Sequence, residues 1–312
     1  MSRFWDMGKH LGDKGHAAMT IKKEKAAAAA GAQPGKNGFA LISGDKLLQL
    51  YAAMLKCRML QERVFALSNK NKLKGIGSST AGQEAAVAGT VIDLFAEDFV
   101  GGSDSGFIAS FVKGTPLDEI FRQLNASKGR ANTLATQLAL AIGAARDNKT
   151  NRNGRIAVVF RGDASASPAL WQKTLSRAGA QGLPMLFVSH SGLESAPSRL
   201  QVKTDNIASK AEDYGFPQIT VDGNDVVAVY RVASEAIAHA RKGSGPTLIE
   251  CVPYRLSGPG ENDPIPNMEK YLLRKGLFTG EFKAQVAAAF SRELDAAMKA
   301  AETGTRSAFS KH

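Results

Sequence analysis

Two polar segments that directly follow buried, strand-like runs are the places where this chain could do chemistry. The runs cover residues 156–160 and 185–188. The segments that follow them contain Gly162, Asp163 and Ala164 in the first case, and His190 and Gly192 in the second. Because α/β sheets bind ligands at the carboxyl ends of parallel strands, both segments are candidates for one site. Asp163 could act there as an oxygen ligand for Mg²⁺, or its carboxylate could only face the positive end of the next helix.

His190 is the second candidate, because an imidazole at a strand end can exchange protons with a ligand. Ser191 and Glu194 are close to it in sequence, so a new acid–base or nucleophilic group is one hypothesis. The sequence identifies no residue that would orient His190, which favours the alternative that it lines a cleft. Residues 102–106, Gly-Ser-Asp-Ser-Gly, have the spacing of a nucleophile elbow. No strand is expected before them, so a serine nucleophile is not predicted.

The spacing of apolar residues predicts an α/β fold. Short apolar runs at 156–160, 185–188, 218–221 and 247–251 are expected to be strands. Helices are predicted over 43–67, 82–94, 115–124, 133–145 and 168–179, and two more after residue 267. Continuous apolar strands separated by helices indicate a doubly wound parallel sheet with helices on both faces. The helices at the N- and C-terminal ends are expected to be extensions of this sheet domain.

Three short segments carry a family resemblance. They are Gly82-Gln83-Glu84-Ala85, residues 221–226 (Val-Asp-Gly-Asn-Asp-Val) and residues 245–250 (Gly-Pro-Thr-Leu-Ile-Glu). With these segments in order, the chain resembles the α subunit of the decarboxylating component of 2-oxo acid dehydrogenase complexes, of the pyruvate, branched-chain and acetoin types. The resemblance implies a thiamine diphosphate-binding fold with thiamine diphosphate and Mg²⁺ as cofactors. It also implies a β-subunit-like partner in an α₂β₂-like assembly or a homo-oligomer, and contact with the acyltransferase core of a dehydrogenase complex.

The implied cofactor site departs from the family pattern at several positions. Gly162 and Asp163 are kept, but Ala164 stands where the family has a second glycine, and His190 stands where it has a glutamate. Gly192 stands where an asparagine would ligate Mg²⁺, and it has no side-chain oxygen. Three further parts of the pattern are missing: the Tyr-Arg clamp for the diphosphate at residues 100–107, the pyrimidine cradle between Arg130 and Thr133, and the histidine of the loop at 256–260.

Composition limits the class of protein and its partners. The chain has 312 residues, a net charge of +11 and two cysteines, Cys57 and Cys251, which suggests a reducing compartment such as the cytoplasm. Residues 1–36 hold seven Lys/Arg and three Asp/Glu, so residues 1–38 are expected to form a basic mobile arm before a domain at 39–312. Apart from Phe4 and Trp5, no Phe, Trp or Tyr lies among these charges, which argues against nucleic acid. No apolar run is long enough to span a membrane or to resemble a signal peptide core.

The leading hypothesis from sequence is an α-subunit-like protein that has lost cofactor binding and acts as a structural or regulatory subunit. One alternative is an active α subunit that carries out oxidative decarboxylation of a 2-oxo acid together with a β subunit. A second alternative is a small-molecule binder that uses the cleft near His190. The candidate cofactor-binding residues are Gly162, Asp163, Ala164, His190 and Gly192, with Asp163 as the candidate metal ligand.

Overall fold

The strands lie in one sheet, and every neighbouring pair of strands is parallel. The computed structural model describes residues 42–69, 82–102, 106–126, 134–161, 168–190, 214–252 and 263–309. Its strands are β1 (Phe99–Gly102), β2 (Ala157–Arg161), β3 (Met185–His190), β4 (Gln218–Asp222) and β5 (Thr247–Val252). Their order across the sheet is β1-β2-β3-β5-β4. The four strands predicted from sequence are confirmed. β1 was not predicted, because Phe-Val-Gly-Gly is too short and too glycine-rich to show a strand pattern.

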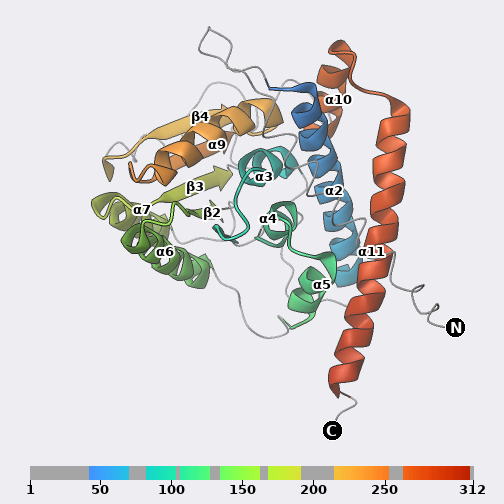
Figure 1. Ribbon diagram of the computed structural model, residues 1–312, viewed down its shortest axis with the longest axis horizontal. Helices are drawn as coiled ribbons and strands as arrows, with labels where there is room; N and C mark the ends of the chain where they lie inside the picture. Colours follow the sequence, from blue (N-terminus) through green and yellow to red (C-terminus); the bar gives the residue numbers. More distant parts are fainter. Residues whose placement is uncertain are drawn as a thin grey trace, which may run out of the picture. The chain divides into compact units, whose positions relative to one another are not determined.

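Helices cover both faces of this sheet (Figure 1). They are α2 (Gly44–Asn69), α3 (Glu84–Val91), α4 (Gly106–Lys113), α5 (Leu117–Ala126), α6 (Leu134–Asn151), α7 (Pro168–Ala180), α9 (Val226–Arg241), α10 (Pro264–Arg274) and α11 (Gly280–Phe309). α7 connects β2 to β3, and α9 connects β4 to β5 in the opposite direction across the sheet. Connections between parallel strands are right-handed, so two connections that run in opposite directions across the sheet place their helices, α7 and α9, on opposite faces. The predicted doubly wound arrangement is therefore confirmed.

Alternating strand residues build two separate cores. In β2, Val158 and Phe160 join a cluster with α3, α4 and α9, whereas Ala157 and Val159 join a cluster with α6 and α7. Leu186 and Val188 of β3 follow the same alternation, as expected where successive side chains point to opposite faces. Because both faces are covered, these strands are apolar throughout rather than amphipathic.

The terminal extensions pack on the side of the sheet that carries α3 and α4. α2 and α11 lie side by side (Figure 1), and a third cluster joins Leu60 and Val64 of α2 to Phe290 and Leu294 of α11. The chain from Gly44 onward forms one compact unit. The predicted arm, residues 1–38, lies outside the described residues. Among the described helices, none is long and apolar enough to cross a membrane.

Candidate functional site

Only one of the predicted cofactor residues lies in the described part of the chain. Gly162, Asp163, Ala164 and Gly192 lie outside it, so their role stays a prediction. His190 is the last residue of β3 and pairs in register with Cys251 of β5. β2 and β3 run parallel as predicted, so the two segments that follow them start from the same edge of the sheet.

His190 points to the face of the sheet that carries α3, α4 and α9. Val188, two residues earlier, and Cys251 both belong to the core cluster on that face. The His190 Nδ1 atom is buried, and no described residue forms a hydrogen bond with it. Burial lowers the pKa of this imidazole to about 4. His190 is therefore neutral at pH 7 and brings no positive charge to a phosphate.

Stability should depend on pH through this histidine. Its pKa is about 6.5 in an unfolded chain and about 4 in the folded one, so below pH 6.5 the unfolded state binds more protons. The free energy of unfolding should fall as pH drops from about 6.5 to about 4. Glutamine does not titrate, so the free energy of unfolding of His190→Gln should fall less between pH 7 and pH 5 than that of the wild type. Urea unfolding at the two pH values measures this difference. An equal loss in both proteins would contradict the buried neutral imidazole.

The neighbouring strand ends offer few oxygen ligands to a metal ion. β1, β2 and β3 end in Gly102, Arg161 and His190, whose side chains contain no oxygen. Arg161 points to the other face, where its guanidinium lies 5.6 Å from the centre of the Trp171 ring. Among the described residues, no group of three His, Cys, Asp or Glu could hold a metal ion. Asp163 and Gly192, the positions that the resemblance assigns to Mg²⁺, lie outside the described residues, so the described strand ends do not test that site.

Cys251, the neighbour of His190, is not an activated nucleophile. Its side chain is fully buried. Burial, followed by the charges of Glu250 and Asp222, raises the pKa of this thiol to about 12. The nucleophile and metal ligand is the thiolate, which is absent here at neutral pH. The two register partners at the strand ends are therefore an uncharged imidazole and an uncharged thiol.

The nucleophile-elbow interpretation needs one correction. The sequence predicted no strand before residues 102–106. In the structure, β1 ends at Gly102 and α4 begins at Gly106. A strand–turn–helix arrangement is therefore present at this position. Residues 103–105, which contain both serines, lie outside the described part. The structure therefore does not test whether His190 could serve as a base for either serine.

A partly buried charge network that the sequence did not predict lies where α2, α3 and α10 meet. Arg58 Nε donates to Glu84 Oε1 at 2.5 Å, and its two terminal nitrogens donate to Asp263 at 2.9 and 3.1 Å. Glu84 is fully buried, and its second oxygen accepts the N–H of Gly82 at 2.9 Å. Asp263 also accepts the N–H of Ile265 at the start of α10. One guanidinium thus joins the first residue of α3 to the N-cap residue of α10.

The network shifts the pKa values of Arg58 and Asp263. Hydrogen bonding to Glu84 is the main reason that the pKa of Arg58 lies above its usual value. Burial alone would raise the pKa of Asp263, but hydrogen bonds from Arg58 and Ile265 outweigh it and hold that pKa below its usual value. Glu84 belongs to a motif that carries the family resemblance. No signal in the sequence marks Arg58 or Asp263, which are 205 residues apart.

The other resembling segments also make structural contacts. Asp222 ends β4 and accepts the N–H of Asn224 at 2.9 Å. Gly223 is close to Cys251, since a Cβ on it would lie 3.0 Å from the Cys251 Cβ. Asp225 is the N-cap of α9 and accepts the N–H groups of Val227 and Ala228. The segment 221–226 therefore forms a tight turn and a helix cap.

Comparison with known proteins decides the family. Residues 51–264 match the model of the dehydrogenase E1 component family. The chain belongs to this family. It is 31% identical to the α subunit of acetoin:2,6-dichlorophenolindophenol oxidoreductase of Bacillus subtilis, over 71% of this chain and 74% of that protein. It is 28% identical to the pyruvate dehydrogenase E1 component α subunits of Staphylococcus epidermidis and Staphylococcus aureus, over 84% of this chain and 79% of each.

This E1 protein is of the α-subunit type, as its sequence predicts. The match to the family model begins within α2 and ends at the first residue of α10, so it contains the sheet, Arg58, Glu84, His190 and Asp263. Most of α10 and all of α11 lie beyond the matched residues.

Proposed function

We propose that this chain is an E1 α-type subunit that acts through assembly with a β-subunit-like protein and does not bind thiamine diphosphate with Mg²⁺. The observation that carries the proposal is the amino-acid sequence that follows β2 and β3. Gly192 removes an oxygen ligand, Ala164 adds a methyl group where the backbone should approach a phosphate, and His190 is neutral.

The contacts that hold the fold together support a structural or regulatory role. The segments that resemble the family make contacts that serve folding: Glu84 in the buried network, Asp222 in a turn and Asp225 as a helix cap. Both core clusters of the sheet are filled by apolar side chains. Loss of cofactor ligands in such a protein would leave its surfaces available for assembly. The acyltransferase core of a dehydrogenase complex is a further candidate partner.

The alternative is a working α subunit for oxidative decarboxylation of a 2-oxo acid. Gly162-Asp163 favours it, because this pair matches the family pattern. The names of the relatives, an oxidoreductase and pyruvate dehydrogenases, favour it as well. Cofactor binding separates the two proposals, since an active subunit must hold the diphosphate and a structural subunit need not.

Assembly is tested by light scattering on the full chain, alone and with the β-subunit-like protein of the same organism. We expect a particle larger than the 33.1 kDa monomer, because an obligate assembly buries more than about 2,000 Å². Addition of the β-like protein should increase its mass further. A clean monomer that the β-like protein leaves unchanged would rule out the assembly role, whatever the result of cofactor titration.

A further inference from the structure

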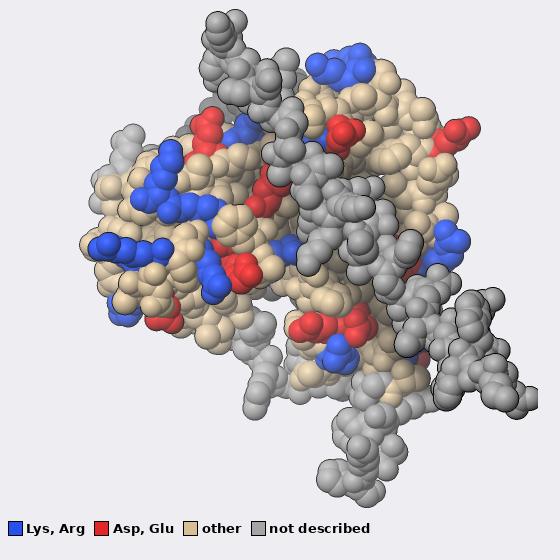
Figure 2. All heavy atoms as spheres, viewed as in Figure 1, with Lys and Arg blue, Asp and Glu red and all other residues tan. Residues whose placement is uncertain are grey.

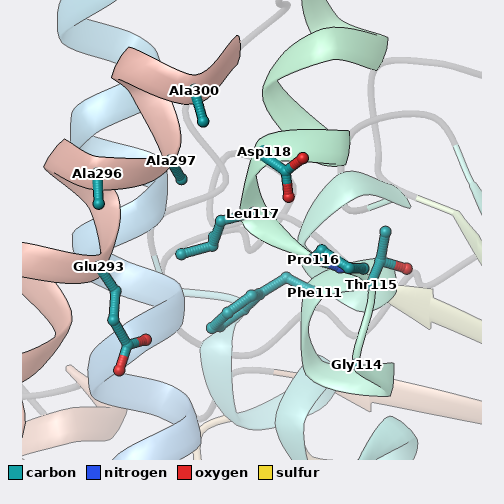
Figure 3. A pocket seen from close by; sticks show the side chains of 10 residues that line it. All are labelled: Phe111, Gly114, Thr115, Pro116, Leu117, Asp118, Glu293, Ala296, Ala297 and Ala300. Atoms are coloured by element: carbon teal, nitrogen blue, oxygen red, sulfur yellow. The ribbon is translucent and has the colours of Figure 1, made fainter. Parts of the chain in front are cut away.

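A groove lies between α11 on one side and the junction of α4 with α5 on the other (Figure 3). Its volume is about 560 Å³. Phe111 and Leu117 form part of one wall, and Ala296, Ala297 and Ala300 line the α11 side. None of the residues that line the groove belongs to the sheet.

The spacing of residues on α11 explains why a groove exists here. Glu293, Ala296, Ala297 and Ala300 stand at i, i+3, i+4 and i+7, so they form one stripe along the helix. Three of these four residues end at Cβ and cannot fill the space beside α5. Ala296 and Ala300 are exposed, so a molecule from solvent can reach the stripe. A stripe of this kind accepts the side chains of an opposing helix.

The charge of the groove opposes that of the chain. Asp118 and Glu293 are the charged residues among those that line it, and both are acidic, although the chain carries +11 overall. Asp118 forms an ion pair with Arg122 one turn later, at 2.8 Å. A carboxylate can accept several hydrogen bonds, so Asp118 could accept further ones from a ligand. On this face of the molecule, Asp and Glu side chains lie together over α5 with a basic side chain beside them, whereas acidic and basic side chains are intermixed over α6, α7 and α9 (Figure 2).

We propose that this groove docks a basic amphipathic helix of a partner protein. Apolar side chains of that helix would enter between Phe111, Leu117 and the alanines, and its Lys or Arg side chains would meet Asp118 and Glu293. The charge of the lining selects a cationic partner. The proposal does not depend on whether the strand edge near His190 holds a cofactor, because the two places share no residue.

The probe for this docking is a fluorescent amphipathic Leu/Lys peptide of about 15 residues, long enough to form a helix. A Leu/Glu peptide of the same length and pattern is the control for charge. Fluorescence anisotropy with the full chain should show saturable binding of the Leu/Lys peptide and none of the Leu/Glu peptide. Net charge alone would give the opposite preference, since a +11 protein repels cations.

Two pairs of variants locate the binding. Glu293→Lys should weaken binding of the Leu/Lys peptide about tenfold, a typical effect of about 1.4 kcal/mol, whereas Glu281→Lys makes the same charge change in the first turn of α11, outside the groove. Ala300→Tyr should fill the groove and weaken binding similarly. Its control is Ala288→Tyr, at an exposed position of α11 that does not line the groove.

Several results would overturn the docking proposal. They are absence of saturable binding, equal binding of the Leu/Glu peptide, and equal loss of affinity in the groove variants and their controls. A second copy of the chain is the competing occupant. If Ala300→Tyr dissociates an oligomer of the full chain in light scattering while Ala288→Tyr does not, the groove is a self-association surface and the partner-helix proposal is wrong.

Discussion

Replacing Arg58 with methionine should lower the free energy of unfolding by about 3–5 kcal/mol, the cost of breaking a buried ion pair. Without the guanidinium, Glu84 remains a fully buried carboxylate whose described partner is one backbone N–H, that of Gly82. Asp263 loses its two bonds to Arg58 as well. Urea unfolding followed by circular dichroism measures the loss, and Arg58→Lys should recover only part of it because an ammonium cannot reproduce the forked geometry.

Arg63→Met is the matched control for this result. Arg63 lies on the same helix and pairs with Asp295, whose side chain is 56% exposed. A solvated pair of this kind contributes about 0–1 kcal/mol. In the double variant Arg58→Met/Glu84→Gln, part of the lost stability should return, because the buried charge is removed. If the free energy of unfolding falls equally in the Arg58 and Arg63 variants, the network around Glu84 contributes no more to stability than an exposed ion pair does.

Titration calorimetry should show no saturable binding of thiamine diphosphate below about 1 mM, with Mg²⁺ present and with or without the β-subunit-like protein. A hydrogen bond to a charged group contributes about 1.5–3 kcal/mol. The chain lacks the asparagine ligand at Gly192 and the Tyr-Arg clamp at residues 100–107, so several such contributions are missing. A total loss of about 5 kcal/mol weakens binding more than a thousandfold.

A repair variant tests which loss matters most. Gly192→Asn with Ala164→Gly restores the metal ligand and the space for the phosphate, but not the pyrimidine cradle missing between Arg130 and Thr133. We expect this double variant to regain little binding. Micromolar binding by the wild-type chain would support the active α subunit instead, and tight binding by the repair variant alone would show that the missing cradle contributes little.

The amino-acid sequence by itself determined most of the secondary structure and the family. The runs at 156–160 and 247–251 became β2 and β5 within one residue at each end, because a strand buried on both faces must be apolar throughout. Pro168 was placed correctly at the first position of α7, since proline lacks the N–H that this position leaves unused. Such features depend on neighbouring residues alone, so a local pattern reveals them.

Tertiary structure decided what distant residues do together. β5 lies between β3 and β4, and nothing in a strand's own composition states its place in the sheet. β1 is a strand because it pairs with β2, not because Phe-Val-Gly-Gly favours one. Arg58 and Asp263 meet across 205 residues, and the acidic groove forms only where α11 passes α5. Each of these contacts results from the packing of whole elements, which a single sequence does not encode in any local pattern.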